Sequence, residues 1–132
     1  MRNYKLALRP ALEAEVDLVI HGGDLLYRSK VPATLFQLAL EPLIEVAERG
    51  IPVILVPGNH ERSKIKVSLF ESHPNLQIFH EPQTFHQKIR GTRIALSGFP
   101  YQRELRQNFL EVLSRSAWQD QPADFHLLCM HQ

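Results

Sequence analysis

The sequence predicts an α/β fold, because apolar segments of strand length alternate with segments of helical periodicity. Residues 16–20 and 53–56 form apolar runs that stop at Gly-Gly and Pro-Gly, as short buried strands do. Between them, apolar side chains recur at i, i+3 and i+4 from near Pro32 to Gly50, as in a helix packed on a core. A strand, a helix and a strand in this order predict parallel neighbours joined by a right-handed crossover.

The other elements follow from the same two patterns. Residues 4–15 are rich in Ala, Leu and Glu and predict a first helix. Pro42 is expected to kink the helix that follows Pro32. Further helices are predicted over 66–72 and 103–117. Further strands are predicted over 76–80, 84–89 and 92–97, and in the final apolar run "DFHLLCMHQ", which we expect to be buried.

Length and composition indicate one soluble globular unit covering residues 1–132. Of these residues, 44% are hydrophobic and 22% are charged. The formal net charge of +1 gives no general attraction to nucleic acid or to an anionic membrane, so either partner would need a local patch. The single cysteine, Cys129, has no partner for an internal disulfide, which favours a reducing compartment and predicts a cytoplasmic protein. No signal peptide or membrane span is expected from the sequence.

Three of the apolar runs end in groups that can bind a metal ion. Asp24 follows "LVIHGG", Asn59 and His60 follow "VILVPG", and His131 follows "HLLCM". Ligands bind beyond the carboxyl ends of parallel strands, so these side chains are expected to form one cluster. A carboxylate, an amide oxygen and an imidazole suit divalent manganese, iron or zinc.

Each of these residues also has a simpler interpretation. Asp after Gly-Gly is often a turn residue or a helix cap, Asn after Gly often adopts a left-handed conformation, and a strand-end His is often only hydrogen-bonded. The metal hypothesis depends on the coincidence of three such strand ends.

These motifs resemble those of the calcineurin-like metallophosphoesterases. The segments "HGGDLLYRSKVP" and "IPVILVPGNHERS" are most similar to the SbcD-type DNA-repair exonucleases, and "CMHQ" follows the expected later strand. The resemblance implies a sandwich of two mixed sheets flanked by helices. It also implies two divalent ions, usually manganese, with Asp24 as their bridge, Asn59 and His131 as ligands of the second ion, and His60 as a catalytic group near the phosphate.

The sequence also departs from the family pattern. An Asp-x-His motif normally ends the first strand, and a Gly-His-x-His motif normally follows the last; neither is present. We therefore expect a chain truncated at both ends, which holds at most one metal ion weakly and exposes an apolar sheet face and edge.

Basic residues follow the two turns that carry the predicted ligands. Arg28, Lys30, Arg62, Lys64 and Lys66 form a rim that could contact a phosphate backbone, although charges of this kind also commonly keep loops soluble. His21 is expected to be a core or sheet-face histidine, with a supporting role beside the ligands as the alternative.

The resemblance implies a metal-dependent phosphodiester hydrolase whose substrate is DNA, with an SbcC-like ATPase and a second copy of the chain as partners. One alternative is a phosphatase or a phosphodiesterase of small molecules, because the motifs define the reaction centre and not the leaving group. The other is a catalytically incomplete fragment that serves as an interaction module.

Overall fold

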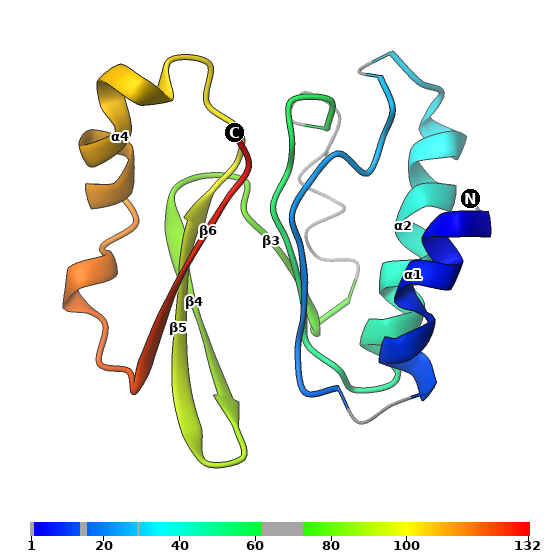
Figure 1. Cartoon of the computed structure of the whole chain (residues 1–132), viewed down its shortest axis with the longest axis horizontal. Helices are drawn as coiled ribbons and strands as arrows, with labels where there is room; N and C mark the ends of the chain where they lie inside the picture. Colours follow the sequence, from blue (N-terminus) through cyan, green and yellow to red (C-terminus); the bar gives the residue numbers. More distant parts are fainter. Residues whose placement is uncertain (1, 14–15, 29, 62–72) are drawn as a thin grey trace.

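The computed structural model describes residues 2–13, 16–28, 30–61 and 73–132. Its elements form the four predicted layers, in the order helix, sheet, sheet and helix (Figure 1). Sheet A contains three parallel strands in spatial order, β1 (Val19–His21), β2 (Val53–Leu55) and β3 (Leu76–Ile78). Sheet B contains β4 (Gln83–Ile89), β5 (Thr92–Phe99) and β6 (Phe125–Met130). In sheet B, β4 is antiparallel to β5 and β6 is parallel to it.

Helices cover the outer face of each sheet. The helices α1 (Arg2–Glu13) and α2 (Ala33–Glu48) lie on sheet A, and α4 (Leu105–Ser114) lies on sheet B, followed by the short helix η1 (Trp118–Asp120) (Figure 1). The helix α2 begins after Pro32, as predicted, and continues through Pro42. The helix predicted over 66–72 lies outside the described residues. No helix in the described part of the chain is long and apolar enough to cross a membrane.

Three groups of buried side chains hold the layers together. The largest lies between sheet A and its two helices and includes Leu40, Leu43 and Leu55. The second lies between the sheets. The third joins Phe99 of β5 to Leu105 and Val112 of the α4 region. The apolar stripe predicted for the fourth helical segment therefore faces a core, although the helix is shorter than predicted.

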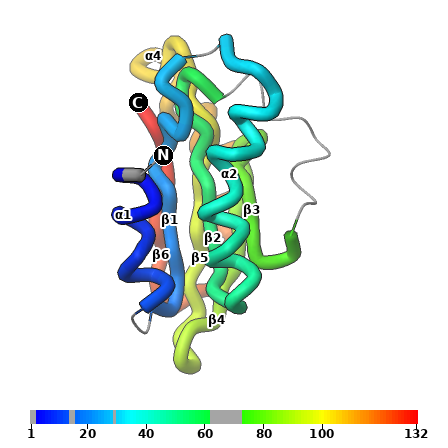
Figure 2. The backbone as a smooth tube through the Cα atoms, turned by 90° about the vertical axis from the view of Figure 1, so that its right-hand side faces the viewer, coloured from blue at the N-terminus to red at the C-terminus, as the bar shows by residue number. Residues whose placement is uncertain are grey.

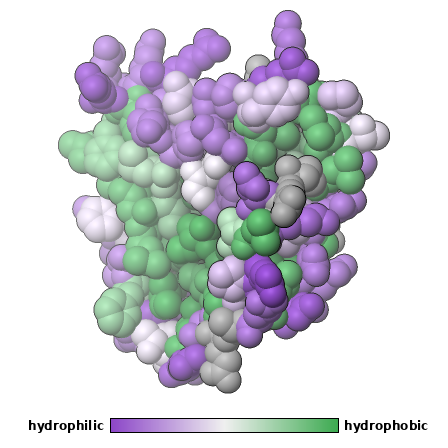
Figure 3. Space-filling view, turned by 45° about the vertical axis from the view of Figure 1, so that its right-hand side comes forward, coloured by the Kyte–Doolittle hydropathy of each residue, from purple (hydrophilic) through white to green (hydrophobic). Residues whose placement is uncertain are grey.

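The last strand is more exposed than the sequence predicted. Of the six residues of β6, only Cys129 is buried. Each sheet has two edge strands in the described structure, and one from each sheet, β1 and β6, lies on the same side of the sandwich (Figures 1 and 2). Apolar side chains gather along the left side of the surface shown in Figure 3. An apolar run predicts a strand, but burial also requires a neighbour on each edge, which β6 lacks within the described residues.

Candidate metal centre

The segments that follow β1, β2 and β6 meet at one end of the sandwich. The contacts around Gly23 show how closely they approach, because a Cβ atom placed there would lie 2.5 Å from Nδ1 of His131 and 2.9 Å from the carbonyl oxygen of Val56. The sequence predicted that the cluster lies at strand ends of an α/β sheet. In the structure, β1 and β2 belong to sheet A, whereas β6 belongs to sheet B. The cluster therefore spans the interface between the sheets.

His131 lies beside Asp24 in a defined orientation. Its Nδ1 atom is 2.6 Å from the carbonyl oxygen of Gly22, which can only accept a hydrogen bond, so Nδ1 carries the proton. Its Nε2 atom lies 3.6 Å from Oδ2 of Asp24. A histidine that binds a metal ion through one ring nitrogen typically donates its other ring N–H to a carbonyl or a carboxylate, as His131 does to Gly22.

Asp24 has an unusual backbone conformation and lies directly against a neighbouring glycine. Its φ angle is +52°, in the left-handed region that most residues avoid. A Cβ atom on Gly58 would lie 2.5 Å from Oδ1 of Asp24 and 2.7 Å from its backbone nitrogen. The loop after β2 can approach Asp24 this closely only because residue 58 has no side chain.

Glu61 is a residue of the site that the sequence analysis missed. Its side chain is fully buried, and its carboxylate accepts hydrogen bonds from three backbone amides, those of Asp24 (3.0 Å), Leu26 (2.7 Å) and Gly58 (2.9 Å). The signal was present, because a Glu three residues after Gly58 has the spacing with which a capping-box side chain reaches back to a backbone amide. The sequence could not indicate the hydrogen bonds from Asp24 and Leu26, which lie in the loop after β1.

Two further residues surround the cluster. The ring of Tyr101 lies edge-on to His131 with the ring centroids 6.4 Å apart, and its backbone amide donates to the carbonyl of Pro57 at 2.9 Å. His21 is partly buried, as expected for a sheet-face histidine, and its Nδ1 accepts a hydrogen bond from the amide of Gly23 at 3.3 Å. Burial lowers the pKa of His21, which favours its neutral form.

The remaining predicted residues occupy the turn after β2 and the adjacent surface. Asn59 is exposed and His60 is partly buried, and both lie in a turn that ends next to the buried Glu61. Arg28 is exposed, with its guanidinium carbon 4.9 Å from the centre of the Tyr27 ring. Lys30 is exposed as well. The other predicted rim residues, Arg62, Lys64 and Lys66, lie outside the described residues.

The donor atoms fit one divalent ion better than two. Oxygen and nitrogen ligands lie about 2.0–2.2 Å from an ion such as zinc, so two ligands of one ion are separated by about 3–3.6 Å, close to the spacing of Asp24 and His131. Across the residues that the structure describes, no group of three or more His, Cys, Asp or Glu side chains could hold a metal ion. Among the described residues, a third protein ligand would be of another type, such as the amide of Asn59. The metal roles of these residues stay predictions.

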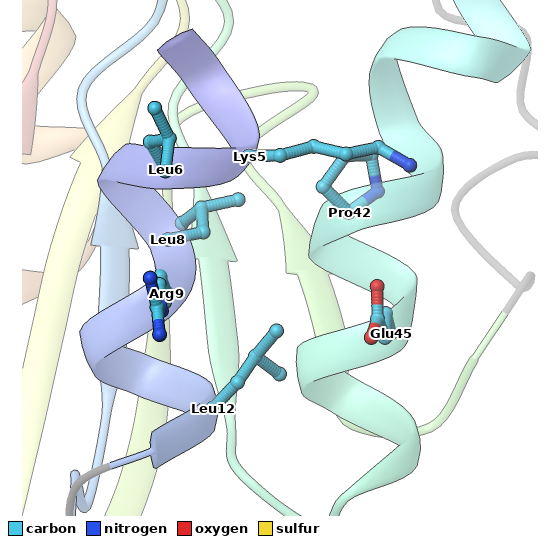
Figure 4. A pocket seen from close by; sticks show the side chains of 7 residues that line it. All are labelled: Lys5, Leu6, Leu8, Arg9, Leu12, Pro42 and Glu45. Atoms are coloured by element: carbon cyan, nitrogen blue, oxygen red, sulfur yellow. The ribbon is translucent and has the colours of Figure 1, made fainter. Parts of the chain in front are cut away.

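A cavity between α1 and α2 is separate from this cluster. It has a volume of about 400 Å³ and lies between α1 and α2, where Leu8, Leu12 and Pro42 lie beside Lys5, Arg9 and Glu45 (Figure 4). None of the predicted ligands lines it.

Comparison with known proteins gives one family throughout. The family model for calcineurin-like phosphoesterases matches residues 2–132. The chain is 23% identical, over its whole length, to the DNA double-strand break repair protein Mre11 of Methanopyrus kandleri, covering 32% of that protein. It is 26% identical to the Mre11 of Archaeoglobus fulgidus over 69% of the chain and 20% of that protein. It is 38% identical to the Mre11 of Methanococcus maripaludis over 40% of the chain and 14% of that protein. The chain thus spans less than a third of the length of these relatives.

Proposed function

Since the chain belongs to the calcineurin-like phosphoesterase family, we propose that it supplies part of the metal-binding centre of a nuclease that hydrolyses DNA phosphodiesters. The observation that carries the proposal is the pair formed by Asp24 and His131, whose facing donor atoms come from different sheets. The hydrogen bond from His131 to Gly22 orients the ring for this purpose.

We assign each residue of the cluster a separate role. Asp24 and His131 would hold a divalent ion, proposed to be manganese, with the amide oxygen of Asn59 as a further protein ligand. Asp24 would also contribute to holding a second ion. When bound, such ions lower the pKa of water and neutralise charge on the phosphate oxygens. His60, which is only partly buried, donates a proton to the leaving oxygen, a role for which an imidazole is suited near neutral pH.

DNA is favoured as the substrate because the relatives named above are DNA double-strand break repair proteins. Arg28 and Lys30, the described residues of the basic rim, are exposed and can bind backbone phosphates. Arg62 and Lys64 are proposed to do the same, because they follow the turn after β2 in the sequence. An SbcC-like ATPase and a second copy of the chain are proposed as partners. The cytoplasm is the proposed location, on the basis of the single cysteine.

Calorimetric titration with Mn²⁺ tests the metal site. We expect one weak site in the wild-type chain and its loss in the variant H131A. The matched control is H126A, because His126 is an exposed histidine of the same strand and is not among the predicted ligands. Equal Mn²⁺ binding by H131A and the wild-type chain would refute the assignment, and two tight sites would contradict the expectation of a single weak one.

The substrate class needs a separate test. Hydrolysis of a chromogenic phosphate bis-ester is compared with hydrolysis of single- and double-stranded DNA, each with and without Mn²⁺. We expect any Mn²⁺-dependent activity to include DNA and to be absent from D24A. Activity confined to the small ester would favour a phosphodiesterase of small molecules. Mn²⁺ binding without hydrolysis of either substrate would favour the catalytically incomplete interaction module.

A further inference from the structure

Glu61 brings a negative charge into a fully buried position beside the candidate metal centre. Burial of a carboxylate is costly unless hydrogen bonds replace its lost water. Here both oxygens are used, since Oε2 accepts from the amides of Asp24 and Gly58, and Oε1 accepts from the amide of Leu26. No ion pair to Glu61 is found among the described residues. The three backbone amides therefore offset the cost of burying this carboxylate.

The three amides belong to two loops that are far apart in the sequence. Asp24 and Leu26 follow β1, whereas Gly58 precedes Glu61 in the turn after β2. One carboxylate thus ties the loop that carries Asp24 to the loop that carries Asn59. Two of the bonds come from Asp24 itself and from the residue two positions later, so they hold the segment in which Asp24 has its left-handed conformation. Charge-assisted hydrogen bonds of this kind can offset the cost of such a conformation.

We infer that Glu61 is a positioning residue, whose carboxylate sets the metal affinity of the centre by holding Asp24 against the Gly58 loop. Glu61 is not assigned as a metal ligand, because its side chain is fully buried and both of its oxygens already accept hydrogen bonds from backbone amides. The inference depends on the proposed function, since it requires Asp24 to bind a metal ion. Groups that orient metal ligands typically change the affinity by about 10- to 100-fold when they are replaced.

Glu61→Gln is the informative substitution because it preserves the size of the side chain. The amide group of Gln has only one oxygen, so its NH2 group must face a backbone N–H that it cannot bind. At least one of the three hydrogen bonds is then lost. We expect Mn²⁺ affinity, measured by calorimetric titration, to fall by about tenfold or more relative to the wild-type chain.

A matched control separates positioning from a general loss of stability. Val46→Ala removes fully buried side-chain atoms from the group between sheet A and its helices, which contains none of the predicted metal ligands. It should lower the thermal midpoint of unfolding while leaving Mn²⁺ affinity unchanged. If E61Q binds Mn²⁺ as well as the wild-type chain does, or loses no more affinity than V46A does at a comparable thermal midpoint, the positioning role is wrong.

A second measurement uses the wild-type chain and does not depend on whether E61Q folds. Hydrogen exchange of the Asp24, Leu26 and Gly58 amides is followed with and without Mn²⁺. Binding at Asp24 should slow exchange at all three sites together, because the same carboxylate holds them. Mn²⁺ binding that leaves these amides unaffected overturns the inference about Glu61. The variant D24A tests the proposed function separately, because undiminished Mn²⁺ binding by D24A would refute the metal site itself.

Discussion

The strands β2 and β6 both carry the chain to the candidate metal centre, but they do so from different surroundings. All three residues of β2 are fully buried, and the strand pairs with β1 on one edge and β3 on the other. In β6, which pairs with β5, Leu128 is 46% exposed and Phe125 is 64% exposed. The two strands are similar in apolar character, so their position in the sheet decides their burial.

The candidate metal centre has two halves, one supplied by the loops of sheet A and the other by His131 at the end of β6. The two halves are held in different ways. The loop after β2 is fixed by a buried strand and by the carboxylate of Glu61. His131, at the end of β6, is held by its hydrogen bond to Gly22, and Gln132 next to it donates from its side chain to the carbonyl of Gln102 at 2.9 Å. The half supplied by sheet A is therefore built into the core, whereas the half supplied by β6 depends on a few polar contacts. Ligand binding should order the second half more than the first.

The largest effect is expected when a leucine is replaced by alanine in β2, and the same replacement in β6 should cost much less stability. Leu55→Ala in β2 creates a cavity in the core and should lower the free energy of unfolding by about 2–5 kcal/mol. Leu128→Ala in β6 removes a half-exposed side chain and should cost less than about 1 kcal/mol. Denaturant unfolding of both variants, monitored by circular dichroism, measures the difference. Equal losses would mean that β6 is as enclosed in solution as β2.

A smaller effect is expected where the two loops of sheet A meet. In Gly58→Ala, the new methyl group would collide with the carboxylate and backbone of Asp24, so the loops must separate. In the control Gly22→Ala, the added Cβ has no atom within 4 Å. We expect G58A to lose about 1–3 kcal/mol of stability, as overpacked sites do. It should also bind Mn²⁺ more weakly, whereas G22A should resemble the wild-type chain. Indistinguishable thermal midpoints and Mn²⁺ affinities for the two variants would contradict the close approach seen at Gly58.

The sequence predicted the layers of this fold because periodicity and turn residues are local signals. The runs ending at Gly-Gly and Pro-Gly became β1 and β2, and their parallel pairing followed from the helix between them. The family pattern led us to expect an exposed apolar sheet face and edge, but the run of β6 itself was expected to be buried, because a strand's neighbours are not encoded in the strand. Glu61 was missed for a related reason. Its spacing from Gly58 is local, but its bonds to Asp24 and Leu26 depend on the packing of two distant loops.

The smallest effect concerns the contact that holds the beginning of β6 to β5. The guanidinium of Arg93 lies 3.0 Å from the carboxylate of Asp124, and the backbone amide of Arg93 donates to the same carboxylate at 2.8 Å. The side-chain hydrogen bond from Arg93 is the main cause that lowers the pKa of Asp124 below its ordinary value. Because the folded-state pKa is lowered, the carboxylate stabilises the fold above its ordinary pKa. That contribution is lost as pH falls through the lowered value.

The exposure of both side chains makes this contribution smaller than those at Leu55 and Gly58. The variant R93Q should move the pKa of Asp124 back towards its ordinary value, as measured by NMR titration of the side-chain carboxyl carbon. The backbone amide of residue 93 remains as a donor, so part of the lowering should persist. Asp17 offers a matched comparison, because it is an equally exposed aspartate that pairs with Arg90 at 2.9 Å, away from β6. If R93Q left the pKa of Asp124 unchanged, the ion pair would have no part in attaching β6, and its backbone pairing with β5 would hold the strand at this end.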